Sequence, residues 1–213
     1  MSAIRLLVLG AVRLHGRAHG YMVRNDLEFW GAHEWSNAKP GSIYHALKQL
    51  AKQDLLRPYD TAPSTAGGPP RTEYELTDAG EAEFFRLLRH ALTAIDEKPD
   101  MLTSGIGFLV DLPRDEAVAL LKERIAALDA WRAEVTEHWT PAESTPEEWG
   151  HIGEIMKLWV YNSESGARWT RGLVERLEDG AYVMAGEGER HPTVLPPGMK
   201  NPYAEKSGSS SEK

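Results

Sequence analysis

A short amphipathic helix followed directly by two strand-like segments constrains the fold most strongly. Within residues 39–53 the apolar side chains recur at helical spacing, namely Ile43, Ala46, Leu47, Leu50 and Ala51. Pro40 suits the first helical position, where its missing N–H costs no hydrogen bond. The segments LLRPY (55–59) and TEYEL (72–76) favour strands, and the Pro- and Gly-rich stretch between them predicts a hairpin with a long tip.

Further helices are predicted on both sides of this segment. Residues 3–15 form one, with Leu6, Leu7, Leu9, Val12 and Leu14 facing inward, and residues 20–31 form another after the turn HGRAHG. The strands lead into a helix that Thr77 or Asp78 can cap and that carries Phe84, Phe85, Leu88 and Leu92. The order helix–helix–helix–strand–strand–helix is that of a winged helix-turn-helix, whose third helix enters DNA and whose hairpin is the wing.

The second half of the sequence predicts two long helices. The apolar stripe of the first runs through Val118, Leu121, Ile125, Leu128, Arg132, Val135 and Trp139. Thr145 and Pro146 start the second, whose stripe runs through Trp149, Ile152, Met156, Trp159, Ser163, Gly166, Thr170, Leu173 and Leu177. We therefore expect a mainly α fold with a small β-wing, built from an N-terminal winged helix-turn-helix and C-terminal antiparallel helices. The predicted domains are 1–95 for DNA binding, 96–185 for dimerisation and possible effector binding, and 186–213 as a disordered tail.

Composition excludes several classes of protein. The 213 residues contain no cysteine, which rules out disulfides and thiolate metal sites and favours a cytoplasmic protein. Arg5 and Arg13 interrupt the apolar run at the N-terminus, so it predicts a core helix rather than a signal peptide. No stretch approaches the roughly 18 apolar residues of a membrane span.

The acidic charge of the chain lies in its second half. The formal net charge is -8, but residues 1–92 hold 11 Lys+Arg against 10 Asp+Glu, a balance of +1, and residues 93–213 carry the remaining -9. The first part can therefore present a basic surface to nucleic acid although the whole chain is acidic.

Residues 6–92 resemble the PadR family of bacterial transcriptional regulators. The matching pieces, in order, are LLVLGAV (6–12), HGY (19–21), PGSIYHAL (40–47), LKQLAKQDLL (47–56) and GGPPRTEYELTDAG (67–80). The later stretch LWVYNSESGARW is similar to the C-terminal dimerisation region of larger members. The resemblance implies a winged-helix homodimer that binds a palindromic operator in double-stranded DNA, often as a repressor that a small molecule releases.

Two positions depart from the family pattern. Lys39 stands where many members have a capping Ser, and Lys39 cannot accept a capping hydrogen bond, but it places a cation where a phosphate can lie. Asp54 stands where many members have Gly at the helix end, and Asp tolerates the left-handed conformation better than most residues.

The outward face of the helix at 40–53 holds the main candidates for DNA binding. Ser42 and Tyr44 can donate hydroxyl hydrogen bonds to phosphates, whereas His45, Lys48 and Gln49 are suited to base edges. The alternative is an ordinary solvated helix face. Outside this helix, Tyr21, Arg57 at the base of the wing and Arg71 near its tip are candidate phosphate or minor-groove contacts, with plain surface roles as alternatives.

The C-terminal helices offer candidates for an effector pocket or a dimer interface. Trp149 and Trp159 are expected in a core or an interface, with a ligand pocket as the alternative, and Met156 lies on the same stripe. Ser163 and Gly166 either allow two helices to approach closely or leave a cavity. Arg132 either pairs with an acidic residue or reaches solvent, or it neutralises an anionic effector such as a carboxylate. The effector expected in such a pocket is a small aromatic or anionic molecule.

Catalysis, metal binding and cofactors find no support in the sequence. TSGIG (103–107) lacks the lysine and spacing of a phosphate-binding loop, and no histidine or acidic cluster supplies three convergent metal ligands. We therefore predict a regulator that is not an enzyme. Two other functions remain open, namely a winged-helix protein-interaction module and a small-molecule sensor without direct DNA binding.

Overall fold

The computed structural model describes residues 2–60, 72–140 and 145–189, which divide into two compact units. The first unit comprises the described residues up to 91 together with 98–108, and the second comprises 92–97 and 109–189. Residues 98–108 therefore pack with the N-terminal unit, although the sequence prediction grouped them with the C-terminal helices.

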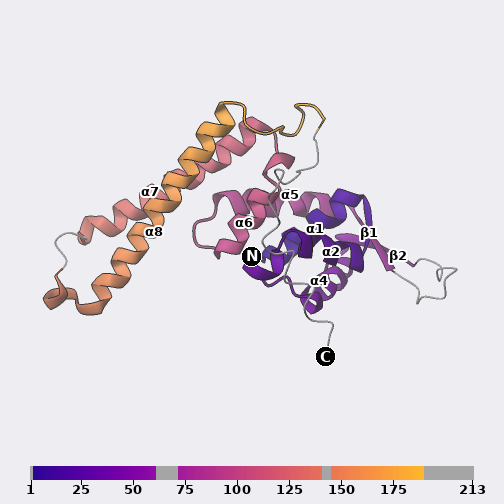
Figure 1. The fold of residues 1–213 in the computed structure, drawn as a ribbon, viewed down its shortest axis with the longest axis horizontal. Helices are drawn as coiled ribbons and strands as arrows, with labels where there is room; N and C mark the ends of the chain where they lie inside the picture. Colours follow the sequence, from indigo (N-terminus) through magenta and orange to yellow (C-terminus); the bar gives the residue numbers. More distant parts are fainter. Residues whose placement is uncertain (1, 61–71, 141–144, 190–213) are drawn as a thin grey trace, which may run out of the picture. The chain divides into compact units, whose positions relative to one another are not determined.

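The first unit is a winged helix-turn-helix, which confirms the predicted fold class for this part of the chain. Its elements are α1 (Ala3–His15), β1 (Arg17–His19), α2 (Gly20–Phe29), α3 (Ala32–Trp35), α4 (Pro40–Lys52), β2 (Leu56–Asp60), β3 (Thr72–Leu76), most of α5 (Asp78–Thr93) and α6 (Pro99–Gly107) (Figure 1). In this arrangement α4 is the recognition helix and the β2–β3 hairpin is the wing.

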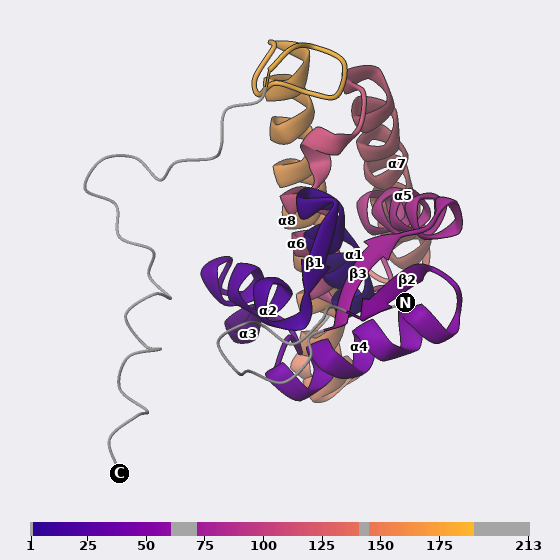
Figure 2. The same ribbon diagram turned by 90° about the vertical axis from the view of Figure 1, so that its right-hand side faces the viewer.

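The sheet has a third strand where the sequence predicted only a turn. Strand β3 lies between β1 and β2 and pairs antiparallel with both, as Figure 2 shows. Ala18 is opposite Tyr74 on one side, and Pro58 is opposite Tyr74 on the other. The segment HGRAHG was therefore predicted wrongly, because its third to fifth residues, Arg17–His19, form β1.

Apolar side chains of α1, α4 and α5 form the core of the first unit. Leu6, Leu9, Ile43, Leu47 and Phe84 are all fully or almost fully buried. The prediction that Leu14 faces inward is wrong, since this side chain is 67% exposed. The buried residues of α1 end at Val12, so the last turn of the helix extends past the core.

The two ends of α4 adopt the conformations that its residues favour. Pro40 occupies the first turn, and the preceding Lys39 makes no side-chain capping bond, as expected for a residue without an acceptor. Just beyond the helix, Asp54 has a φ of 56°. This is the left-handed conformation that was expected here, because many members of the family have Gly at this position.

The base of the wing is tied to α5 through Thr77. Its hydroxyl accepts the backbone N–H of Gly80 at 3.0 Å and donates to the carbonyl of Asp54 at 2.7 Å. A Cβ added at Gly80 would lie 2.0 Å from the carbonyl oxygen of Leu55. Glycine is therefore required where α5 starts, because the helix passes directly over the backbone that enters β2.

The second unit is a helical hairpin of α7 (Arg114–His138) and α8 (Pro146–Glu178), preceded by the short helix η1 (Leu109–Asp111). The two long helices run side by side and antiparallel, since residues near the start of α7 contact residues near the end of α8 (Figure 1). This confirms the predicted antiparallel C-terminal helices. None of the described helices combines the length and apolar character needed to cross a lipid bilayer.

The stripe by which α8 packs on α7 differs from the predicted one in its first half. Ser163, Thr170, Leu173 and Leu177 are buried as expected, whereas Trp149, Ile152 and Trp159 are exposed. The buried positions in this half are Gly153 and Val160. Gly150 has a non-helical backbone with a φ of 52°, so the helical frame does not continue through it and Trp149 belongs to a different phase.

Arg114 fastens the chain that follows α8 onto the start of α7. Its guanidinium donates to the carbonyls of Leu177, Ala181 and Tyr182 at 2.5, 2.9 and 2.8 Å and pairs with Glu187 at 2.7 Å. One guanidinium thus ties the last turn of α8 and the residues that follow it to the start of α7. Met184, within the fastened segment, is completely buried. Residues 186–189 of the predicted tail are thus described, and the rest of that tail lies outside the described residues.

The Glu187 carboxylate is expected to make the second unit sensitive to acid. Its pKa is lowered from 4.5 to about 2, first by the hydrogen bond from Arg114 and then by the backbone N–H of Met184. A depressed folded-state pKa contributes stability that is complete above the unfolded value and is lost as the pH falls toward the folded one. We therefore expect the melting temperature, followed by circular dichroism, to fall between about pH 5 and pH 2. Glu187→Gln should lower it at pH 7 and flatten this acid dependence, whereas Glu189→Gln should behave as the wild type.

Candidate nucleic-acid interface

Helix α4 presents a polar face whose side chains make no hydrogen bond or ion pair within the described part of the chain. Ile43, Ala46, Leu47 and Leu50 are buried and seat the helix. The predicted DNA-binding residues lie on the other side, with Tyr44, His45 and Lys48 exposed and Ser42 and Gln49 half-buried. Among the described residues, the side chains of Ser42, His45, Lys48 and Gln49 have no hydrogen-bond or ionic partner. Their donors and acceptors are therefore available to a ligand.

The charge of this face is uniformly positive. Helix α4 contains Lys48 and Lys52 and no acidic residue, and the exposed Lys39 precedes it. The chain has 32 acidic residues, but none of them lies on α4. A phosphate that approaches this helix therefore meets no carboxylate on it.

Tyr44 covers the start of α2. A Cβ added at Gly20 would lie 2.4 Å from Cε1 of the Tyr44 ring, so glycine at this position is what allows the ring to lie there. Tyr21 follows Gly20 and is 56% exposed. The two predicted tyrosines thus lie around the N-terminal end of one helix, where backbone N–H groups favour an anion.

Arg24 is a residue of this surface that the sequence interpretation missed. Its Nε bonds the Glu28 carboxylate at 2.6 Å. The pKa of Arg24 is raised, first by Glu28 and in smaller measure by Tyr44 and Tyr21, which places the guanidinium near both tyrosines. A single arginine on a helix carries no local signature, and one of its neighbours, Tyr44, is 20 residues away in the sequence.

Arg57, predicted at the base of the wing, belongs to a network on the exposed face of the sheet. Its guanidinium lies 3.5 Å from the hydroxyl of Tyr59. Arg17 of β1 stacks on the Tyr59 ring at 3.9 Å and bonds Glu75 at 3.2 Å. The pKa of Glu75 is lowered, first by a hydrogen bond from Tyr59 and then by Arg17. Arg17 thus bonds the Glu75 carboxylate directly, and Arg57 joins the network through Tyr59. Glu73, opposite Tyr59 in the register, lies on the same face, so the two arginines there are accompanied by two carboxylates. Arg71, the other wing candidate, lies outside the described residues.

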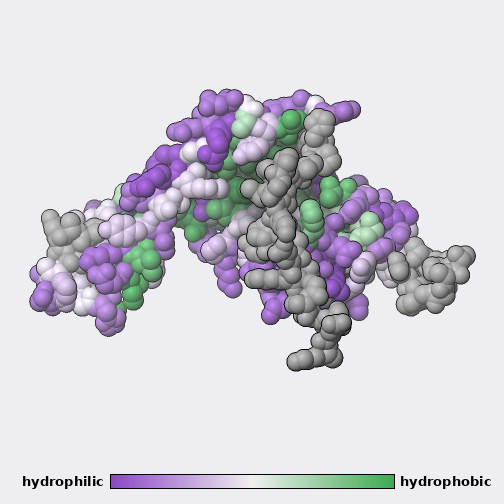
Figure 3. All heavy atoms as spheres, in the orientation of Figure 1, coloured by the Kyte–Doolittle hydropathy of each residue, from purple (hydrophilic) through white to green (hydrophobic). Residues whose placement is uncertain are grey.

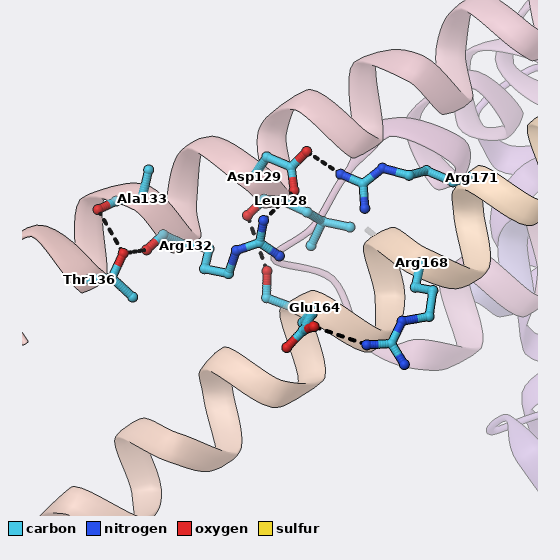
Figure 4. A network of polar contacts seen from close by, with 9 residues as sticks. Leu128, Asp129, Arg132, Ala133, Thr136, Glu164, Arg168 and Arg171 are labelled. Atoms are coloured by element: carbon cyan, nitrogen blue, oxygen red, sulfur yellow. Dashed lines mark hydrogen bonds and ion pairs between the residues drawn. The ribbon is translucent and has the colours of Figure 1, made fainter. Parts of the chain in front are cut away.

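The candidates in the second unit are placed mostly by contacts between α7 and α8. Ser163 is buried and donates to the carbonyl of Leu128 at 3.1 Å. A Cβ at Gly166 would meet Leu128 at 3.6 Å, an ordinary contact distance. Arg132 bonds Asp129 at 2.9 Å, and Asp129 also accepts a hydrogen bond from Arg171 (Figure 4). Ser163 and Arg171 of α8 therefore join the two helices, whereas the bond between Arg132 and Asp129 lies within α7.

Trp149, Met156 and Trp159 lie on the first half of α8. Trp149 packs edge-on against Trp139 with 6.3 Å between ring centroids, and Trp159 is half exposed. Met156 is half-buried. Within the described ranges, no group of three histidine or acidic residues is arranged to hold a metal ion.

Comparison with known proteins identifies the first unit. The model of the family described as "Transcriptional regulator PadR-like family" matches residues 8–86. No curated protein matches the chain by sequence. Among solved structures, Bacillus subtilis PadR in complex with operator DNA is 20% identical, covering 81% of this chain and 98% of that one, with a TM-score of 0.37.

Two further structures are similarly distant. Bacillus subtilis PadR in complex with p-coumaric acid is 20% identical, covering 83% of this chain and 99% of that one, with a TM-score of 0.35. The PadR-like regulator BC1756 from Bacillus cereus is 18% identical, covering 83% and 98%, with a TM-score of 0.33. Similarity at this level says nothing about what this chain binds.

The family match covers the segment from α1 to α5 that forms the winged helix-turn-helix. This match confirms the resemblance found in the sequence. It also confirms the prediction that the protein is a regulator and not an enzyme, since the family consists of transcriptional regulators. The matched segment, residues 8–86, is therefore similar to the PadR-like family of transcriptional regulators.

Proposed function

We propose that this regulator binds a palindromic operator in double-stranded DNA as a homodimer, represses transcription there, and is released by a small molecule. One observation carries the DNA-binding part of the proposal. The outward face of α4 is exposed, free of acidic residues and unpartnered within the described chain, in a winged helix-turn-helix that matches a family of regulators. Side chains of this kind at the start of a recognition helix suit base edges and phosphates of the major groove.

An electrophoretic shift assay tests DNA binding. Purified protein is incubated with fragments of its own genome at about 50 mM and 200 mM salt, because phosphate contacts make affinity fall steeply as salt rises. A shift at low salt that weakens at high salt supports the proposal. The absence of a shift at low salt contradicts it and leaves the protein-interaction module as the function of the winged helix. Sequencing the selected fragments tests whether they share a palindrome.

An exposed apolar face of α8 supports the homodimer. Leu158 is 56% exposed and Tyr161 is 60% exposed, and Ile155 and Trp159 are exposed within one turn of them. Trp169 is exposed further along the same helix. Figure 3 shows apolar surface over part of the α7–α8 hairpin. Contiguous apolar side chains of this size are unusual on a monomer and typical of an interface. A second copy of the same helix offers a matching surface, because a two-fold interface is self-complementary.

A homodimer accounts for the palindromic operator and for repression in this proposal. Two recognition helices related by a two-fold axis contact two half-sites whose spacing is a whole number of helical turns. A dimer bound across such a site covers promoter DNA that polymerase needs. A reporter gene under the selected operator should therefore rise in expression when the regulator is deleted, whereas a fall would identify an activator. A regulator of chromosomal DNA in a bacterium works in the cytoplasm.

The exposed tryptophans of α8 support effector binding and provide its test. Trp149, Trp159 and Trp169 each present part of an indole ring to solvent. An aromatic or anionic compound bound beside them would change their fluorescence and shift the equilibrium between dimer conformations with different half-site spacing. Titration with aromatic carboxylic acids should quench the fluorescence and release operator DNA at the same concentrations. Quenching without release would indicate a sensor whose output is not DNA binding.

A further inference from the structure

A groove of about 610 Å³ separates the first turn of α1 from one flank of α4. Ser2 and Arg5 line it from α1, and Asn37 lines it from the segment before α4. Gln49 and Gln53 line it from α4 itself. This flank is distinct from the flank that carries Tyr44, which lies against Gly20 of α2.

The groove contains no acidic side chain. Arg5 is its permanent cation, and His45 is the only other titratable residue in its lining. The remaining polar side chains are amides and hydroxyls, which donate hydrogen bonds without carrying negative charge. A guanidinium among neutral donors suits the oxygens of a phosphodiester and does not suit a cation.

The donors of the groove are unused in the described chain. No hydrogen bond within the described residues involves the side chains of Asn37, Gln49 or Gln53. Arg5 lies 3.5 Å from Glu83, but Glu83 is bonded more closely by Arg86, at 2.6 and 2.9 Å. The guanidinium of Arg5 is therefore not fully engaged by its intramolecular partner.

We propose that this groove holds the sugar–phosphate backbone of DNA beside the major groove that α4 enters. A helix in the major groove has a phosphate strand on each side, so both flanks of α4 face phosphates when its outward face contacts bases. The Tyr21–Tyr44 side would contact one strand, and the groove would contact the other. The inference rests on the proposed function and adds Arg5, Asn37 and Gln53 to the DNA-contacting residues.

Carboxylates introduced into the groove test this assignment. Asn37→Asp and Gln53→Glu change an amide to an acid of nearly the same shape at exposed positions, so the fold is preserved. Each should weaken binding to operator and unrelated DNA alike, by about tenfold, because phosphate contacts carry no sequence information. Ala82→Glu is the control for net charge, since Ala82 is exposed on α5 of the same unit and does not line the groove. An equal loss in the control would overturn the assignment, because net charge alone would then explain the effect.

Arg5 provides an independent readout through salt. Arg5→Gln should reduce the slope of log affinity against log salt by roughly 0.9, the value for one phosphate contact, while Arg5→Lys should retain the wild-type slope. An unchanged slope in Arg5→Gln, with melting temperature as the check on folding, would remove Arg5 from the interface. If the wild type binds DNA and the groove variants match the Ala82→Glu control, only the groove assignment fails. If the wild type binds no DNA, the proposed function itself fails.

Discussion

A Leu158→Glu protein is expected to be monomeric in solution and to bind operator DNA roughly 10²–10⁴-fold more weakly than the wild type. Leu158 lies in the exposed apolar face of α8 and is 56% exposed in the single chain. A carboxylate there would have to be buried without a partner when two copies associate, and this cost disfavours the dimer. Each winged helix would then bind its half-site alone, without the high effective concentration that a dimer gives the second half-site.

The matched control is Val183→Glu. Val183 is also an exposed apolar residue of the second unit, 40% exposed, but it lies beyond α8 in the segment fastened by Arg114. This variant should remain dimeric in analytical ultracentrifugation and should bind operator DNA as the wild type does. If Leu158→Glu remains a dimer, the interface lies elsewhere. If it is a monomer with undiminished affinity, the two half-sites are not bound together.

Lys48→Ala and His45→Ala are expected to relax the sequence preference of DNA binding. Both side chains are exposed on the outward face of α4 and have no partner in the described chain. Loss of a base contact costs about 1–3 kcal/mol, or roughly 5- to 150-fold in affinity for the preferred base, with a smaller change for unrelated DNA. The measurement is a competition assay between the operator and fragments altered at single base pairs.

The control for this pair of variants is Lys98→Ala, which removes an exposed lysine of the first unit just before α6. It should leave the preference among operator variants unchanged. Undiminished operator affinity in Lys48→Ala would show that the specific contacts are made by another face of the recognition helix. A uniform loss for all sequences would instead identify Lys48 as a phosphate contact.

Local sequence signals predicted the elements of the first unit well, and the exceptions have physical causes. The stripe of α4, Pro40 at its start and Asp54 after its end all act within a few residues of their effect. Strand β1 has only three residues, which is too short to show an alternating pattern. Its existence depends on pairing with β3, whose residues lie 54 to 58 positions further along the chain.

The candidate site was predictable where it lies on one helix and not where several elements contribute. The outward positions of the candidates between Ser42 and Gln49 could be predicted from the helical period of α4 alone. Arg24, Arg5 and Asn37 became candidates only when the fold placed them beside α4 or its neighbouring tyrosines. In the second unit, the α8 stripe was predicted wrongly before Val160. Trp149 is separated from it by the non-helical backbone of Gly150, which a periodic pattern cannot anticipate, and Ile152 and Trp159 each lie one position from the buried residues Gly153 and Val160.

The contacts between α7 and α8 restrict how the hairpin can transmit a signal. Ser163 bonds the carbonyl of Leu128, and the neighbouring Asp129 accepts hydrogen bonds from both Arg132 and Arg171 (Figure 4). Sliding α8 along α7 by a fraction of a turn would break the first bond and separate Arg171 from Asp129 at the same time. Along this stretch the two helices therefore have one favoured register, and any rearrangement of α8 against α7 must break both contacts together.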